Sequence, residues 1–245
     1  MKKTPLLPAM GFLLLSLAAC RKDSLPANGD IVPYEIKTFR LALVNPDYTA
    51  FDTLSFNYDR YGNPTSVTRP NPATGAPDFT FHYDKDHRLT EFIGAYSNPN
   101  VAEFFHKYFY DDKGLITLDS EYVLVSITNG QPSRWSQSYA STIEYDRQGR
   151  ISREISARFS DTAIYTYDGR GNLVNGATYD NKINFHRTNW VWMFLDHDFS
   201  VNNPFKANAY NNASLPLDFT PGTNNNTFLY QNFYTEASLT YQHKL

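Results

Sequence analysis

A short arrangement of apolar and polar positions recurs through the middle of this chain. In Ile143 to Ile151, IEYDRQGRI, an apolar residue and a tyrosine stand two apart, and an aspartate, a glycine and a second apolar residue follow. Residues two apart on a strand point to the same face, so the apolar residue and the tyrosine would share one side of a sheet. The pattern therefore predicts the end of one strand, a turn and the start of the next strand.

Five copies of this pattern occur, with 25, 27, 35 and 22 residues between successive tyrosines. The copies are centred on Tyr58-Asp59, Tyr83-Asp84, Tyr110-Asp111, Tyr145-Asp146 and Tyr167-Asp168. The aspartate can accept hydrogen bonds from backbone N–H groups two residues on, and the glycine suits a left-handed backbone position. Each copy thus predicts a β-hairpin built on a type I turn. His87 replaces the glycine in the second copy, and His is one of the residues tolerated there.

The repeats and the alternation around them predict an all-β fold of about 13 strands paired as an antiparallel meander. The predicted strands cover residues 34–44, 51–59, 63–69, 78–84, 88–96, 103–111, 115–128, 133–146, 150–159, 162–168, 172–179, 227–235 and 238–244. Twisted open sheets rarely exceed about ten strands, so we expect a curved sheet or incomplete barrel with an aromatic concave face.

Two further segments complete the expected fold. Residues 186–197, HRTNWVWMFLDH, predict a short helical or aromatic plug that covers the concave face. Residues 198–226 are rich in Asn and Pro and are expected to be mostly loop, as are residues 69–77 and 129–132.

The N-terminus has a different character. Lys2 and Lys3 precede an apolar run from Leu6 to Leu17, which is shorter than the roughly 20 residues that a transmembrane helix needs. Leu17-Ala18-Ala19-Cys20 follows, and Cys20 is the single cysteine of the chain. These residues resemble the lipobox of bacterial lipoproteins.

That resemblance implies a signal peptide over residues 1–19, lipidation of Cys20 and a flexible lipidated tether over residues 20–33. A single β domain over residues 34–245 would follow. Arg21 stands where the inner-membrane retention signal of such lipoproteins has Asp, so we expect a lipid anchor in the outer membrane. Two or more acyl chains hold a protein stably at a bilayer. Both a periplasmic and a surface-exposed position remain open.

Composition restricts the partners. Without Lys2 and Lys3 the chain carries 20 basic residues against 25 acidic ones, a net charge of −5, so nucleic acid is not an expected partner. One cysteine leaves no intrachain disulfide. Aromatic residues make up 16% of the chain, which is typical of half-buried strands. We expect a monomer.

The aligned repeats resemble the tyrosine–aspartate (YD) repeats of Rhs-type proteins. Tyr179 to Asn211, which contains Asn202-Asn203-Pro204, resembles a domain of unknown function with a porin-like β fold that is common in lipoproteins. The resemblance covers about residues 34–245 and departs from the family pattern at His87 and at Phe185-His186. It implies the β fold but no activity, because the family has none established.

The chain contains no GxSxG, HExxH, P-loop or GxGxxG motif, and its six histidines show no ligand spacing. We therefore expect a non-enzymatic structural or binding lipoprotein without a metal or cofactor. Three rival hypotheses stay open. Trp190 and Trp192 could form the stacking platform of a glycan- or peptide-binding protein, the concave face could carry a lipid, and Asp196-His197-Asp198 could serve a hydrolase.

Overall fold

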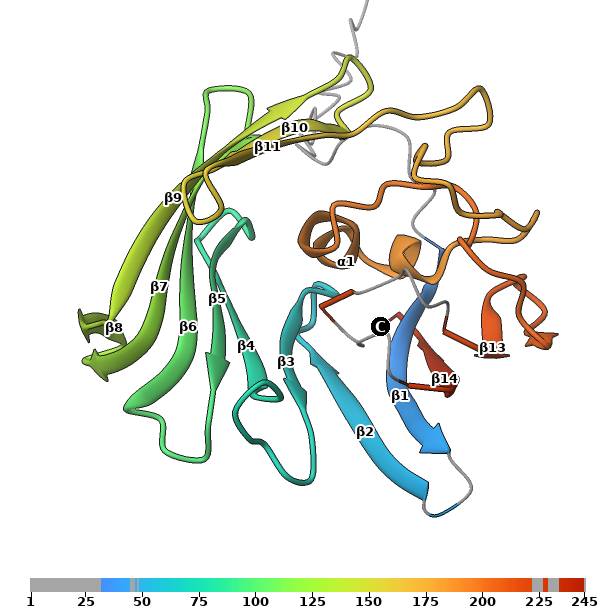
Figure 1. Ribbon diagram of the computed structural model, residues 1–245, viewed down its shortest axis with the longest axis horizontal. Helices are drawn as coiled ribbons and strands as arrows, with labels where there is room; N and C mark the ends of the chain where they lie inside the picture. Colours follow the sequence, from blue (N-terminus) through green and yellow to red (C-terminus); the bar gives the residue numbers. More distant parts are fainter. Residues whose placement is uncertain (1–31, 45–46, 48, 222–226, 229–233, 245) are drawn as a thin grey trace, which may run out of the picture.

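A computed structural model describes residues 32–44, 47, 49–221, 227–228 and 234–244 of the chain. The predicted signal peptide, Cys20 and the tether as far as residue 31 lie outside the described residues. The described strands form one 14-stranded antiparallel sheet that curves around a single short α-helix (Figure 1). The prediction of an all-β curved sheet with a short helical plug is confirmed.

The elements follow the repeats closely over the first two thirds of the chain. The first seven strands are β1 (Tyr34–Val44), β2 (Thr49–Tyr58), β3 (Pro64–Thr68), β4 (Asp78–Tyr83), β5 (Leu89–Ala95), β6 (Val101–Tyr110) and β7 (Ile116–Thr128). The others are β8 (Gln131–Arg134), β9 (Gln137–Tyr145), β10 (Ile151–Ser156), β11 (Asp161–Ile164), β12 (Ala209–Tyr210), β13 (Pro216–Phe219) and β14 (Glu236–His243). The helical segments are the 3₁₀ helix η1 (Phe185–Thr188) and α1 (Trp190–Leu195).

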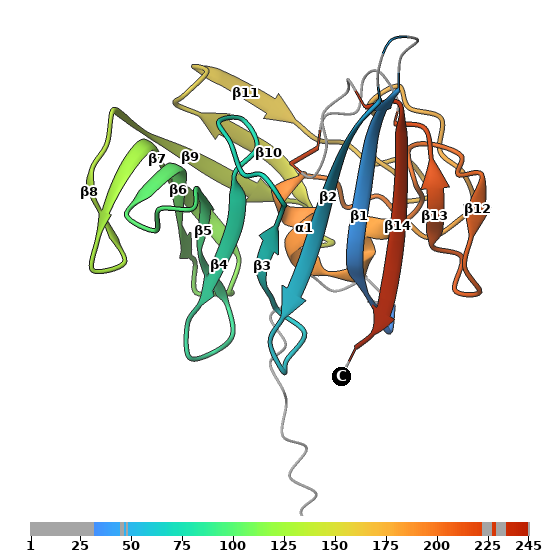
Figure 2. The same cartoon turned by 90° about the horizontal axis from the view of Figure 1, so that it is seen from below.

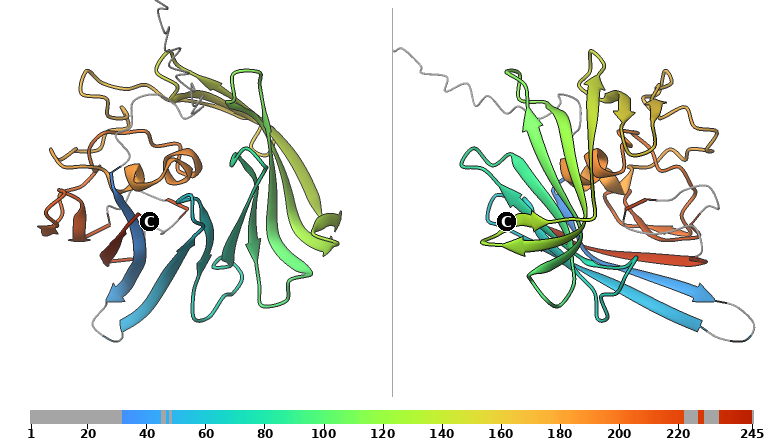
Figure 3. Two further views of the ribbon diagram at one scale, coloured as in Figure 1. Left: turned by 180° about the vertical axis from the view of Figure 1, so that it is seen from behind. Right: turned by 60° about the vertical axis from the view of Figure 1, so that its left-hand side comes forward.

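The sheet is an antiparallel meander, and the C-terminal strands are added to it beside β1. Strands β1 to β11 lie in chain order, except that β8 pairs only with β7, so that β7 also pairs with β9. The C-terminal strand β14 pairs antiparallel with β1, and β13 and β12 continue the sheet beyond it (Figure 2). The sheet ends at β11 on one side and β12 on the other, so it is not closed (Figure 3).

The five predicted turns share one hydrogen-bond arrangement. In each, Oδ1 of the repeat aspartate accepts from the backbone N–H groups two and four residues on, at 2.8–3.0 Å. The residue at the glycine position donates its N–H to the carbonyl of the same aspartate. His87 adopts a φ of 61° there, which identifies it as a turn residue.

A sixth turn of the same kind was missed from the sequence. Asn211 Oδ1 accepts from the N–H of Ala213 at 2.9 Å and of Leu215 at 3.0 Å, and Ser214 takes the left-handed position with a φ of 63°. Asn and Ser replace the Asp and Gly of the repeat, so the pattern was not visible. This turn joins β12 to β13 within residues 198–226, whose described part is otherwise loop, as predicted.

The repeat tyrosines link successive units. Each donates its hydroxyl hydrogen to a main-chain carbonyl at the start of a strand of the preceding unit, at 2.7–3.3 Å. The pairs are Tyr58–Ile36, Tyr83–Pro64, Tyr110–Leu89, Tyr145–Ile116, Tyr167–Ile151 and, beyond the five repeats, Tyr241–Pro216. Burial raises the pKa of each of these phenols above the ordinary value of 10.0, so they stay protonated donors in the folded chain.

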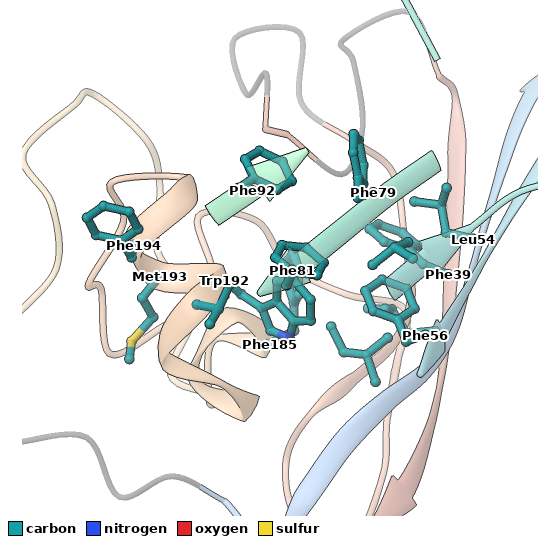
Figure 4. Close-up of a cluster of buried hydrophobic side chains, with 14 of the residues drawn as sticks. Phe39, Leu54, Phe56, Phe79, Phe81, Phe92, Phe185, Trp192, Met193 and Phe194 are labelled. Carbon is teal, nitrogen blue, oxygen red and sulfur yellow. The ribbon is translucent and has the colours of Figure 1, made fainter. Parts of the chain in front are cut away.

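The core lies between the concave face of the sheet and the plug. Trp192 of α1 lies beside Phe56 and Phe81, which project from β2 and β4 (Figure 4). Asn189 begins the helix, since its Oδ1 accepts from the N–H of Val191 at 2.9 Å while its Nδ2 donates to the Gly62 carbonyl at 2.8 Å. The first repeat turn therefore holds the start of the plug against the sheet.

Three strand predictions were wrong. Residues 172–179 make a single bridge, Tyr167 with Leu173, and the N–H of Leu173 donates to the side chain of Ser200 and not to a neighbouring strand. Residues 227, 228, 234 and 235 lie outside any strand, and residues 229–233 are not described. The predicted strand 133–146 is split into β8 and β9, where Ser136 turns to bond the Val123 carbonyl.

Replacing Asp146 with alanine is expected to lower the free energy of unfolding by about 2 kcal/mol, because two backbone N–H groups lose a charged acceptor. Asp146→Asn should cost about half as much, since Asn211 makes the same two bonds in the sixth turn. Urea unfolding followed by circular dichroism measures both effects. The control is Asp112→Ala, at an exposed turn residue. Equal losses at Asp146 and Asp112 would contradict the prediction.

Candidate functional site

The concave face is not completely filled by the plug. Beyond the C-terminal end of α1, an open groove of about 470 Å³ lies over strands β4 to β10. Its floor is aromatic, its far wall is polar, and Phe194 and Leu195 of α1 form part of its near side. This groove combines a concave apolar surface with polar groups in defined positions, which is typical of a small-molecule site.

Aromatic rings from neighbouring strands make up the floor. The ring centroid of Phe92 lies 5.4 Å from that of Phe79 and 5.0 Å from that of Phe104. Phe228 lies 6.1 Å from Phe92, perpendicular to it. Phe104 and Phe228 are partly exposed, whereas Phe79 and Phe92 are buried. The accessible ring faces are therefore fixed from behind by other rings.

Gly94 determines where the Phe104 ring lies. The two residues are directly opposite each other on β5 and β6. A Cβ atom at Gly94 would lie 2.4 Å from the ring of Phe104, which is far inside van der Waals contact. The missing side chain lets the ring lie over the sheet and form part of the groove floor.

Polar residues form a row across four strands of the concave face. Tyr108 of β6 lies opposite Asp119 of β7, Asp119 opposite Ser141 of β9, and Ser141 opposite Ser156 of β10. All four residues line the groove. Such residues are directly adjacent on paired strands, so the row presents several hydrogen-bonding groups at short spacing.

Three ion pairs border this row. His106 Nδ1 lies 2.9 Å from Asp119 Oδ2, and His197 Nδ1 lies 3.3 Å from Glu154 Oε2. Arg158 pairs with Glu121. The carboxylates are therefore held in position by His106, His197 and Arg158, while the carboxylate side chains stay 13–19% exposed.

Burial disfavours the protonated form of His106, but the adjacent Asp119 carboxylate outweighs this and raises the pKa of His106 above its ordinary value of 6.5. Because the pKa of His106 is higher in the folded chain than in the unfolded chain, its pair with Asp119 stabilises the fold below pH 6.5. This stabilisation is lost as the pH rises through the pKa of the folded chain.

The difference in unfolding free energy between the wild type and His106→Gln is expected to fall as the pH rises from 6.5 through the folded pKa of His106. Urea melts at successive pH values measure it, and Asp119→Asn should abolish the trend. A constant difference would contradict it.

The cluster Asp196-His197-Asp198 does not converge on one point. Asp196 Oδ2 lies 2.6 Å from His186 Nε2, and Asp198 Oδ1 accepts from the N–H of Ser200 at 2.8 Å. His197 points the other way, with Nδ1 2.9 Å from the Tyr165 hydroxyl. Only His197 lines the groove, so the three residues form no common site. Within the described part of the chain no group of His, Cys, Asp and Glu could hold a metal ion.

The two tryptophans do not form an exposed platform. Trp192 is 0% exposed, and Trp190 is half buried and stacked on Phe194 at 5.1 Å. Neither lines the groove, whose accessible rings come from Phe104, Phe228 and Phe159 instead. The predicted aromatic concave face thus contains the groove, but Trp192 belongs to the buried core and not to the groove lining.

Comparisons of the sequence with protein-family models and with curated proteins found no match from which a function could be transferred. No protein-family model matches the sequence, and no curated protein matches it. None of the helices in the described ranges has the length and apolar content needed to cross a bilayer.

Proposed function

We propose that this chain is a non-enzymatic binding lipoprotein, anchored to the outer membrane through Cys20, that holds a neutral oligosaccharide in the concave groove. The observation that carries the proposal is the aromatic floor bordered by ion-paired carboxylates. A sugar ring has apolar faces, which can lie on Phe104 and Phe228, and hydroxyl groups at its edge. Fixed carboxylates, serines and a guanidinium beside the floor suit those hydroxyl groups.

A lipid fits the same groove less well. An alkyl chain in it would exclude water from Asp119, Glu121 and Glu154 without offering a hydrogen bond in exchange, and this loss of hydration is costly. An acidic ligand would meet these three carboxylates, and Arg158 beside them is already paired with Glu121. A neutral polyol avoids both penalties.

The lipid anchor follows from the lipobox residues that end at Cys20. Its test is incorporation of labelled palmitate into the wild-type chain and its loss in Cys20→Ser. Protease treatment of intact cells then separates surface exposure from a periplasmic position. Absence of label in the wild type would refute the anchor and leave the groove proposal untouched.

The binding test uses the mature chain carrying Cys20→Ser, screened against an array of neutral and acidic oligosaccharides, with calorimetry on each positive. Phe104→Ala and Glu121→Gln are expected to weaken binding of a neutral oligosaccharide by about tenfold each, the equivalent of one good contact. The matched control is Phe109→Ala, at a residue of the same strand that is 49% exposed and does not line the groove.

Binding of a neutral oligosaccharide that depends on Phe104 and not on Phe109 supports the proposal. Binding that is unaffected by Phe104→Ala and Glu121→Gln places the ligand elsewhere and refutes it. Failure of every oligosaccharide to bind also refutes it.

A further inference from the structure

A second cavity, of about 590 Å³, is lined by residues of the loops and of β12 that precede β13. It shares no lining residue with the groove. Its residues come from two segments, 170–182 and 204–210, which are brought together around Asp180. Asn202-Asn203-Pro204, whose role the sequence did not explain, enters this junction.

Asp180, the one carboxylate among the residues that line the cavity, already accepts hydrogen bonds at both of its oxygens. Asp180 Oδ1 accepts from the N–H groups of Lys182 at 2.9 Å and Asn203 at 3.1 Å. Its Oδ2 accepts from Asn203 Nδ2 at 3.0 Å and from the Tyr210 hydroxyl at 2.8 Å. These four bonds fasten the two segments together, so Asp180 serves the frame of the cavity and not its contents.

Three cations line the same cavity with little compensation. Arg170 Nε lies 3.6 Å from Asp168 Oδ2, a loose pair in which the arginine side chain is 64% exposed. Lys182 Nζ lies 5.7 Å from the centroid of the Tyr210 ring. Among the described residues, neither Lys182 nor Lys206 forms an ion pair. A local excess of positive charge on a chain with net charge −3 marks this cavity as unusual.

Aromatic side chains supply the remaining walls. Tyr179 and Tyr210 are half buried, and Phe205 is 8% exposed and stacked on Phe219 at 3.9 Å. Pro204 adds a further apolar surface. The lining of the cavity therefore combines aromatic and prolyl surface with three cationic side chains.

We propose that this cavity binds a phosphate monoester carried on a ring. The dianionic phosphate would meet Arg170, Lys182 and Lys206, and the ring would lie against Tyr179 and Tyr210. Arginine and lysine are the usual partners of phosphate, and a dianion compensates more of the excess charge than a carboxylate does. The proposal is independent of the oligosaccharide groove, because the two sites share no residue.

The test is calorimetry of the mature Cys20→Ser chain with phenyl phosphate at low salt, beside phenol and inorganic phosphate. Lys182→Gln/Lys206→Gln is expected to weaken binding of phenyl phosphate by about tenfold or more, because two charge-assisted contacts are lost. The matched control is Lys85→Gln/Lys113→Gln, which removes the same charge from two exposed turn residues. Phenol should not bind, and inorganic phosphate should bind more weakly than phenyl phosphate.

A second arm separates a soluble ligand from a membrane headgroup. Phosphatidylcholine vesicles with and without phosphatidylinositol 4-phosphate, whose headgroup carries a phosphate monoester on a ring, are sedimented with the same protein. Sedimentation that requires phosphatidylinositol 4-phosphate and is lost in Lys182→Gln/Lys206→Gln supports the site, with a lipid headgroup as its source. Equal losses in the two double variants, or no response to either phosphate probe, would overturn the proposal.

Discussion

Replacement of Trp192 with alanine is expected to lower the free energy of unfolding by about 3–5 kcal/mol, among the largest effects of any single change in this chain. Trp192 is 0% exposed, and its ring meets Phe56 at 5.4 Å and Phe81 at 5.7 Å, edge to face. Phe228 stacks on it from the other side at 5.6 Å. The mutation therefore removes the contact between the plug and two strands and leaves a cavity where they meet.

Urea unfolding followed by circular dichroism measures this loss independently of tryptophan fluorescence. The matched control is Trp135→Ala, because Trp135 is 46% exposed and packs mainly on Tyr122. Exposed substitutions of this kind usually change stability by less than about 0.5 kcal/mol, or somewhat more when an aromatic pair is lost. Similar losses at both tryptophans would show that the plug is not the centre of the core.

Asp196→Ala is expected to cost a comparable amount, about 3–5 kcal/mol, because it leaves buried partners without an acceptor. The side chains of Asp196 and His186 are 5% and 2% exposed, and their pair spans 2.6 Å. The other carboxylate oxygen accepts from the N–H of Phe228, also at 2.6 Å. One carboxylate thus joins η1, the end of α1 and the segment that contains Phe228.

Asp196→Asn separates the loss of charge from the loss of the acceptor. An amide oxygen can keep one of the two bonds, so the asparagine variant should lose clearly less stability than the alanine variant. Asp112→Ala again provides the exposed control. A fully stable Asp196→Ala protein would contradict this structural role and would reopen the hydrolase hypothesis.

The repeat turns show which part of the fold is specified by local sequence alone. Every bond of the Asp111 turn is made within about five residues, so the residue types alone specify it. The turn at Asn211 is equally local, yet it escaped notice because Asn and Ser can fill the roles of Asp and Gly. Because the turn was missed, the short strands β12 and β13 were not predicted, although the rest of the described part of residues 198–226 is loop, as expected.

The inward orientation of the groove carboxylates could not be predicted from strict alternation, because a β-bulge follows the turns that precede β7 and β10. Between β6 and β7 the pairing shifts after Tyr110–Ile116, so that Asp119 and Glu121 come to face inward with Ile116. The shift after Ile151 does the same for Glu154. A one-residue shift exchanges the two faces of a strand, and a simple count from the turn places these carboxylates outside. The run of polar residues in β7 was the sequence signal from which polar groups on the concave face could have been predicted.

The sequence by itself determined the turns, the curved all-β sheet and the aromatic plug, because each depends on contacts within one hairpin or on the burial of a long apolar run. Tertiary structure alone decided that β14 joins β1, that Trp192 is core, and that Asp119, Glu121 and Glu154 face one groove while Arg170, Lys182 and Lys206 line another cavity. These arrangements depend on pairings and bulges between residues far apart in the chain, where local residue preference carries no information.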